Sequence, residues 1–226
     1  MRSAHRTAVL ALAAVVACSS LGDPGQPVAI EFLVPIPTAV EVGDTITLRA
    51  RVLDQNGDSA DAEIRWRTPD TTVAVDSITG AFWGVSGTSG RVQPTSGSLV
   101  IPLVTFVVRA RADTVILSTA AESLFVATAD TESALLSPKV AKFDGTGLGD
   151  RMVIFTLLEP TDSSVVLSGD VLIDTLTTKG DGTPSPGIRI KKRGTLPDRA
   201  VVEVGARRVS GATVPGSGQR IRIFFE

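Results

Sequence analysis

Apolar and polar residues alternate with a period of two along much of this chain, and turn-forming residues interrupt the alternation at short intervals. One such stretch, residues 45–53, is followed by a strong turn signal at residues 54–58 (Asp-Gln-Asn-Gly-Asp). A period of two places successive side chains on opposite faces of a β-strand. Many short strands separated by turn signals are typical of a β-sandwich. The pattern therefore predicts an all-β protein, with no convincing helix after the N-terminal segment.

The composition supports strands and limits what can fill a core. Hydrophobic residues make up 43% of the 226 residues, yet aromatic residues are only 4% and tyrosine is absent. The core must therefore consist mainly of Val, Ile, Leu and Ala, and the β-branched residues among these favour strands. The length suits one large domain or two of about a hundred residues each. We expect strands at residues 28–34, 45–53, 64–67, 72–76, 80–85, 90–93, 99–112, 124–128, 140–143, 151–158, 165–167, 171–176, 187–191, 199–209 and 220–225.

The single cysteine, Cys18, and the single histidine, His5, both lie in the first eighteen residues. A disulfide framework and a zinc site of Cys and His are therefore excluded after Cys18. A serine or cysteine nucleophile with a histidine base is excluded as well. The formal net charge of -2 argues against a general nucleic-acid binder. We expect no enzyme, no cofactor and no metal site; a carboxylate-based hydrolase is a distant alternative, because no motif singles out a pair of Asp or Glu residues.

The N-terminus has the build of a signal peptide. Arg2, His5 and Arg6 are followed by a short apolar run at residues 8–17, which is too short to span a bilayer as a helix. The run ends in Val15-Val16-Ala17-Cys18, which resembles the lipobox of bacterial lipoproteins. The resemblance implies cleavage before Cys18 and acylation of its thiol and new N-terminus, and several acyl chains anchor a protein firmly. The alternatives are a plain secretory signal with a chance cysteine, or an uncleaved short anchor.

The sequence after Cys18 bears on location. Ser19 and Ser20, with no Asp directly after Cys18, resemble the outer-membrane sorting pattern of lipoproteins. We therefore expect the cell envelope, with the outer membrane favoured and the chain facing the periplasm or the exterior. Removal of the signal peptide would leave an acidic body without a basic tail, which is not suited to lie along anionic lipid. The lipid on Cys18 should then be the contact with the membrane.

We divide the chain into four segments: a signal peptide at 1–17, a Ser/Gly/Pro-rich tether at 18–27, and two β-sandwich domains at 28–112 and 113–226. The first domain resembles the group 2 bacterial immunoglobulin-like domains. The matching pieces are Val40-Glu41-Val42-Gly43-Asp44-Thr45-Ile46-Thr47-Leu48-Arg49-Ala50, Trp66-Arg67-Thr68-Pro69-Asp70, Val73-Ala74-Val75-Asp76 and Gly80-Ala81-Phe82-Trp83-Gly84-Val85-Ser86-Gly87. The resemblance covers about residues 28–117 and departs from the family pattern between Val92 and Val104.

The second domain has a weaker resemblance, to the group 1 or invasin-type bacterial immunoglobulin-like domains. The matching pieces are Val153-Ile154-Phe155-Thr156-Leu157, Thr177-Thr178-Lys179-Gly180-Asp181-Gly182-Thr183 and Ala200-Val201-Val202-Glu203-Val204-Gly205-Ala206. Asp144-Gly145-Thr146-Gly147 takes the place of the family's D-x-x-G turn with altered spacing. Gly182 should supply a positive φ in a hairpin. Together the two resemblances imply tandem immunoglobulin-like β-sandwiches.

Surface contacts are the remaining candidate sites. Trp66 should fill the first core, whereas Trp83 is either a second core residue, which we favour, or an exposed contact. Arginine pairs recur on outward strand faces and should be solvated there. If they gathered on one face, they could bind an acidic glycan or a lipid A phosphate. The pairs are Arg49 with Arg51, Arg65 with Arg67, Arg109 with Arg111, Arg207 with Arg208, and Arg220 with Arg222.

Three acidic turns resemble the start of a calcium loop. In the first, Asp54, Asn56 and Asp58 have the right spacing, but Arg65 stands where the bidentate Glu should be. Asp144-Gly145 and Asp181-Gly182 carry even less of the motif. We interpret all three as ordinary turns.

Two classes of function fit these observations. The first is a membrane-anchored structural, adhesion or interaction module that presents loops and strand edges to a protein or surface glycan. The second is an accessory scaffold subunit of a larger envelope or membrane complex. Immunoglobulin-like sandwiches carry many roles, so the fold by itself does not choose between them.

Overall fold

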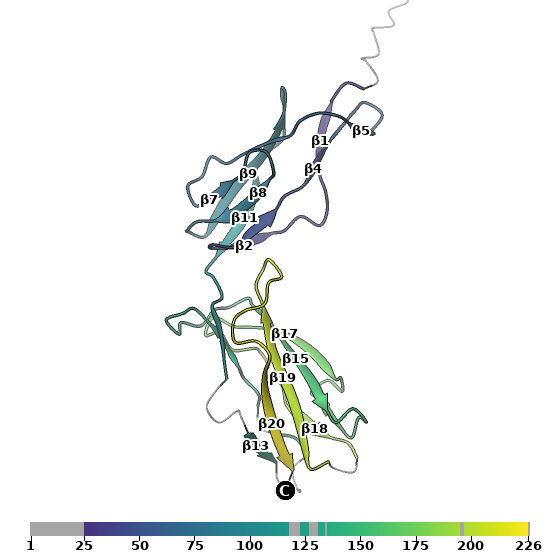
Figure 1. The fold of residues 1–226 in the computed structure, drawn as a ribbon, viewed down its shortest axis with the longest axis vertical. Helices are drawn as coiled ribbons and strands as arrows, with labels where there is room; N and C mark the ends of the chain where they lie inside the picture. The colour runs from purple at the N-terminus through teal and green to yellow at the C-terminus, as the bar shows by residue number, and fades with distance from the viewer. Residues whose placement is uncertain (1–24, 118–122, 127–130, 134, 195–196, 226) are drawn as a thin grey trace, which may run out of the picture.

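The computed structural model describes residues 25–117, 123–126, 131–133, 135–194 and 197–225. The expected signal peptide, Cys18 and residues 18–24 of the expected tether lie outside these residues. All regular structure in the described chain is β-strand, as predicted. In the same residues, no helix is long and apolar enough to cross a membrane. The strands form two β-sandwiches stacked along the long axis of the molecule (Figure 1).

Two sheets make up the first sandwich. In one sheet, β1 pairs with β4, β3 pairs with β8, and β8 pairs with β7, all antiparallel. The chain continues from β3 into β4, which joins these pairs. The other sheet contains β6, β9, β11 and β2, with β2 parallel to β11. The first strand is thus shared between sheets, β1 in one and β2 in the other, as in an immunoglobulin-like sandwich. The strands are β1 (Ala29–Phe32), β2 (Ala39–Glu41), β3 (Thr45–Thr47), β4 (Ala50–Leu53), β5 (Ser59–Ala60), β6 (Arg65–Arg67), β7 (Val73–Val75), β8 (Ala81–Gly84), β9 (Ser89–Ser96), β10 (Leu99–Val100) and β11 (Val104–Arg109).

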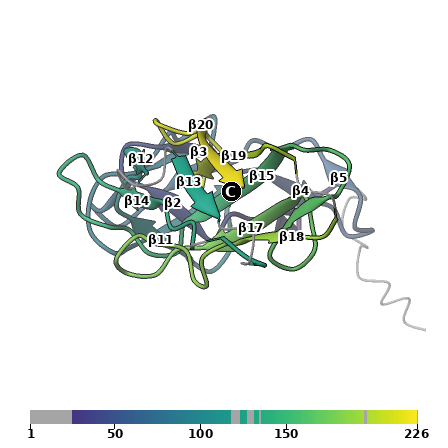
Figure 2. The ribbon, with the colours of Figure 1, turned by 90° about the horizontal axis from the view of Figure 1, so that it is seen from below.

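The second sandwich repeats this arrangement. One sheet has the order β13-β20-β19-β15-β17, with β13 parallel to β20. Facing it, β12 pairs with β14 and β16 with β18, and bridges Leu136–Ile188 and Glu132–Lys191 connect the two pairs. Figure 2 shows this half from the C-terminal end. The strands are β12 (Thr114–Ile116), β13 (Ser123–Val126), β14 (Lys139–Ala141), β15 (Met152–Glu159), β16 (Val165–Leu167), β17 (Ile173–Thr177), β18 (Ile190–Lys192), β19 (Arg199–Arg207) and β20 (Gln219–Phe225).

Each sandwich has its own hydrophobic core. Trp66 is 5% exposed in the first core, as predicted, where it packs against Phe32 at 5.6 Å between ring centroids. Phe82 and Phe106 pack at 4.8 Å in the same core. The second core is built mostly of Val, Ile and Leu around Phe155. The aliphatic composition is therefore sufficient to fill both cores, with four aromatic residues in the first and Phe155 in the second.

Two of the expected strands are divided in two, and the structure adds three short strands that we did not expect, β2, β5 and β12. The strand expected at 45–53 divides into β3 and β4 at Leu48-Arg49, because β3 pairs with β8 whereas β4 pairs with β1 and β5. The strand expected at 99–112 divides into β10 and β11 at residues 101–103. Periodicity alone did not reveal the first break, since the alternation continues through the change of pairing partner; at the second break, β10 and β11 both pair with β9.

The acidic segments form the turns that we expected. Asp54 accepts hydrogen bonds from the backbone N–H groups of Asn56 and Asp58 at 2.8 and 3.0 Å. Asp144 and Asp181 do the same for Thr146 and Thr183, and these backbone hydrogen bonds lower the pKa of both carboxyl groups. Gly182 has a φ of 85°, the left-handed conformation predicted for it.

Gly147 should be required for the fold of the second sandwich. A Cβ at this position would lie 1.8 Å from the carbonyl oxygen of Asp181, so the neighbouring turn would have to move. We expect Gly147→Ala to lower the free energy of unfolding by about 2–4 kcal/mol. Urea denaturation followed by far-UV circular dichroism measures the loss. Gly180→Ala is the control, because a Cβ there meets nothing within 4 Å; equal losses at the two positions would contradict the explanation.

Candidate functional site

The structure does not gather the predicted arginine contacts into one cluster. Arg49 directly precedes β4 and Arg51 lies in it, whereas Arg65 and Arg67 lie on β6 in the opposite sheet. Arg51 pairs with Glu31 at 2.7 Å, Arg65 with Glu63 at 2.6 Å, and Arg67 bonds the side-chain oxygen of Gln93 at 2.7 Å. All four arginines are exposed, as expected. Their placement on two sheets gives no concentrated site for an anionic glycan or phosphate.

Trp83 is not part of the first core, although we favoured that interpretation. Phe82, its neighbour, is fully buried, and the alternation along β8 turns Trp83 to the opposite face, where it is half-buried. Its cross-strand neighbours are Thr45 and Ala74. Trp83 is therefore accessible at the outer face of its sheet.

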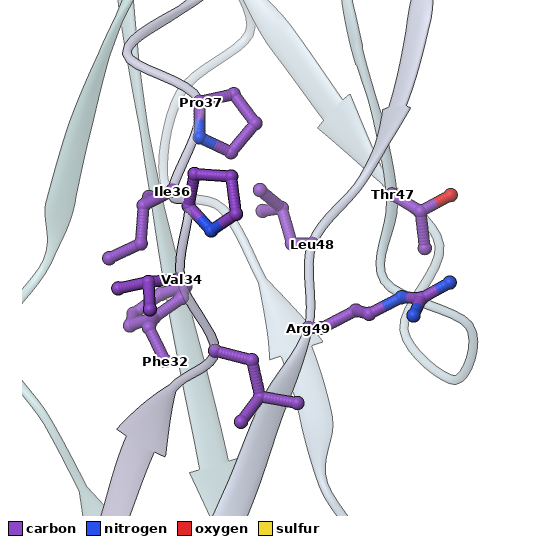
Figure 3. Close-up of a pocket in the computed structure, with 9 residues that line it drawn as sticks. Phe32, Val34, Ile36, Pro37, Thr47, Leu48 and Arg49 are labelled. Atoms are coloured by element: carbon purple, nitrogen blue, oxygen red, sulfur yellow. The ribbon is translucent and has the colours of Figure 1, made fainter.

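A hollow of about 520 Å³ lies between residues 32–37 and residues 47–49. It forms where the chain leaves β1 and crosses to the other sheet as β2. Figure 3 shows Leu48 pointing into the space between the two segments, with Thr47 and Arg49 pointing away from it. The lining is mostly apolar, and no acid, base or nucleophile converges on it. Elsewhere too, within the described ranges, no group of His, Cys, Asp and Glu side chains could hold a metal ion.

The most distinctive polar site lies between the two sandwiches, and it starts from one turn. Glu41 ends β2, and the N–H of Asp44 donates to the carbonyl oxygen of Glu41 at 3.0 Å. Gly43 has a φ of 76°, which this turn requires and which glycine adopts without strain. The turn brings both carboxylates, Glu41 and Asp44, to the end of the first sandwich that meets the second.

Glu41 is completely buried and is the centre of this junction. Its Oε2 accepts a hydrogen bond from the N–H of Ala112 at 2.9 Å, and its Oε1 accepts one from the N–H of Val209 at 3.4 Å. Its Oε1 also lies 2.8 Å from Nε of Arg151, and its Oε2 lies 4.0 Å from Nε of Arg208. One carboxylate of the first sandwich therefore contacts the connecting segment, the residue before β15 and the residues after β19 in the second sandwich.

Asp44 and Arg208 form the second half of the junction. Nη1 of Arg208 lies 3.3 Å from Oδ1 of Asp44, and the hydroxyl of Ser210 donates to Oδ2 at 2.7 Å. Arg208 Nε donates to the carbonyl oxygen of Ala112 at 2.9 Å. The Arg208 side chain is 10% exposed, so our expectation of a solvated face is wrong for this residue. Its position follows from the contact between sandwiches, which the strand pattern does not contain.

Arg151 is the most deeply buried cation of the junction, with a side chain 3% exposed. Its guanidinium donates to the carbonyl oxygens of Gly149, at 2.9 Å, and of Ala110. Burial lowers the pKa of Arg151, and the charge of Glu41 opposes that effect. Because an arginine stays protonated in proteins, the buried charge must be matched by a carboxylate. Glu41 and Asp44 with Arg151 and Arg208 form a set of two negative and two positive charges, which we call the junction cluster.

Sequence reasoning missed the junction cluster. Glu41 and Asp44 were visible only as part of a family-like segment, and Arg151 only as the first residue of the strand expected at 151–158. The sequence held no signal for the burial of Glu41, because Glu41 between Val40 and Val42 has the alternation of an outward-facing strand residue. Its partners lie far away in the sequence, so the residues that neutralise it could not be found by spacing.

Removal of the central carboxylate should be costly. We expect Glu41→Ala to lower the free energy of unfolding by about 3–5 kcal/mol, because it leaves Arg151 buried without its partner. Urea denaturation measures the change. The control is Glu63→Ala, which removes an ion pair whose carboxylate side chain is 65% exposed and should cost about 0–1 kcal/mol. Similar losses for the two variants would show that the junction cluster does not stabilise the protein.

Comparisons with known proteins give distant likenesses only. No family and no curated protein matches the chain. Among solved structures, domains 4 and 5 of the S-layer protein SbsC align over 88% of this chain and 98% of theirs, at 12% identity and a TM-score of 0.35. The Yersinia pseudotuberculosis adhesin InvE aligns over 88% of this chain and 58% of its own, at 13% identity and a TM-score of 0.41. The fibronectin(III)-like modules of Clostridium thermocellum CbhA align over 88% of this chain and 94% of theirs, at 12% identity and a TM-score of 0.40.

Proposed function

We propose that this protein is a membrane-anchored, extracytoplasmic interaction module in which two immunoglobulin-like sandwiches act as one rigid spacer. The observation that carries the proposal is the junction cluster, in which a fully buried Glu41 contacts both the connecting segment and the second sandwich. Domains joined by a flexible linker do not need buried charges between them, and movement would expose Arg151 or Glu41 without a partner.

The chemistry of the described residues supports contact rather than catalysis. Many of the carboxylates accept hydrogen bonds in turns, form exposed ion pairs with arginine, or belong to the junction cluster. The hollow between residues 32–37 and 47–49 is lined mostly by apolar side chains. An interaction module needs a stable scaffold with accessible strand faces and loops, and both sandwiches supply these.

The anchoring half of the proposal rests on the residues around Cys18. The Val15-Val16-Ala17-Cys18 sequence would place the lipid at the start of the tether, close to the first sandwich. The first sandwich would then lie nearest the membrane, and the rigid junction would hold the second at a fixed distance from it. This arrangement suits a module that presents the second sandwich to a partner.

Substitution of Cys18 tests the anchor. We expect the full chain to incorporate labelled palmitate and to fractionate with membranes, and Cys18→Ala to lose the label and remain unprocessed. Mass spectrometry of material purified from native membranes with mild detergent then separates the two classes of function. A partner in fixed stoichiometry would favour a scaffold subunit of an envelope complex. A labelled Cys18→Ala chain, or an unlabelled native chain, would contradict lipid anchoring.

A further inference from the structure

Strand β15 has apolar residues on both faces, with Thr156 beside them on the outer face, although only the inner face packs into the second core. Val153, Phe155 and Leu157 point into the second core. On the opposite face Met152 is 50% exposed, and Ile154 is half-buried. A strand with apolar residues on both faces is typical of a sheet that is covered on both sides. The outer face of β15 therefore has the composition of a contact surface.

The strands beside β15 extend this surface. On the edge strand β17, Ile173 is 60% exposed and lies opposite Thr156. On the other side, β19 places Gly205 opposite Ile154, and the missing side chain contributes to a hollow of about 320 Å³. A Cβ on Gly205 would meet only Ser217, at 3.9 Å. The outer face thus combines projecting apolar side chains with a depression beside them.

Two opposite charges flank Gly205 symmetrically. Glu203 and Arg207 lie two residues before and after it, so both point to the same outer face. Glu203 has a 3.5 Å contact with exposed Arg220. Arg207 bonds the carbonyl oxygen of Gly211 at 3.1 Å, and no carboxylate of the described residues lies within ion-pair distance of it. If two copies of β19 lie antiparallel with their Gly205 residues opposite each other, Glu203 of each copy faces Arg207 of the other.

Association through the β17 edge of the sheet is obstructed, whereas the outer face beside that edge carries exposed side chains. The pairing of β17 with β15 turns the backbone groups of Ile173, Thr175 and Thr177 toward the open edge. The carboxylate of Asp174 accepts the N–H of Thr175 at 2.7 Å, and the N–H of Ser185 donates to the carbonyl oxygen of Thr177. Such occupied edge groups oppose strand-to-strand pairing with another chain.

We propose that the outer face of β15, β17 and β19 binds a second copy of this chain, face to face and antiparallel. Thr175, Ile154 and Gly205 are cross-strand neighbours and form a row across the sheet. With a two-fold axis along this row, β19 of one copy lies over β19 of the other. Each Glu203 then faces Arg207 of the other copy, and the two Ile154 side chains meet at the axis. A self-complementary patch of this kind is what a two-fold symmetric interface requires. Two packed sheets lie about 10 Å apart, a distance that these side chains span.

The antiparallel arrangement has a consequence for anchored copies. The strands of the second sandwich run along the long axis of the molecule (Figure 1), so the two first sandwiches would extend in opposite directions. Copies anchored at Cys18 would therefore meet from two facing membrane surfaces. This consequence rests on the proposed function, whereas the pairing of the two faces does not.

Cysteine cross-linking of the full chain tests the pairing. Ile154→Cys, treated in membranes with a short bifunctional maleimide, should yield a covalent dimer. Ile78→Cys, on an exposed residue of the first sandwich, should not. The chain without an added cysteine controls for Cys18. If the chain proves not to be anchored, the same reaction in solution separates failure of the pairing from failure of the anchor.

Exchange of the charges at Glu203 and Arg207 tests the proposed pairing more specifically than cross-linking alone. In the Ile154→Cys background, Glu203→Arg or Arg207→Glu alone should reduce dimer yield about tenfold, because like charges then face each other. The two substitutions in one chain should restore the yield, and so should a mixture of the two single variants. Equal yields from Ile154→Cys and Ile78→Cys, or no recovery in the doubly substituted chain, would overturn the proposal.

Discussion

The contact between Glu41 and Arg151 is the interaction on which the two-sandwich arrangement depends. Each side chain is almost fully buried, so neither charge could stay in place without the other. Glu41 also accepts the N–H of Ala112, in the segment that connects the sandwiches. Asp44 and Arg208 add a second pair at the same junction. The connecting segment is thereby fixed by hydrogen bonds at its centre, and the orientation of the second sandwich follows from that of the first.

The fold could be predicted from the sequence to a large extent, and the junction could not. The alternation along residues 45–53 agrees with the packing of Ile46 and Leu48 in the first core, and the turn signal at residues 54–58 was correct, because both are local properties of the chain. The division of β3 from β4 was missed, since alternation is the same whichever strand is the partner. Trp83 was misplaced because Phe82 beside it competes for the same core, and one residue of register decides which is buried. Arg208 was misplaced because its carboxylate partners come from the other sandwich.

The same constraint relates the anchor to the contact face. A rigid junction would fix the face around Ile154 and Gly205 relative to the first sandwich, and the Ser/Gly/Pro-rich tether would connect that unit to a lipid at Cys18. With a flexible junction, that face would sample many orientations and encounter a partner less often in the correct one. In the function proposed above, the buried charges would contribute by fixing geometry, although none of them would touch a partner.

The distance distribution between the sandwiches tests the central claim most directly. Spin labels on cysteines placed at the exposed residues Thr71 and Thr161 of a Cys18→Ser chain report that distance by pulsed electron resonance. The account predicts one narrow distribution that is the same at low and high salt, because buried ion pairs are screened little, and a broad distribution after Glu41→Ala. A broad distribution in the chain that retains Glu41, or no change on its removal, would contradict it.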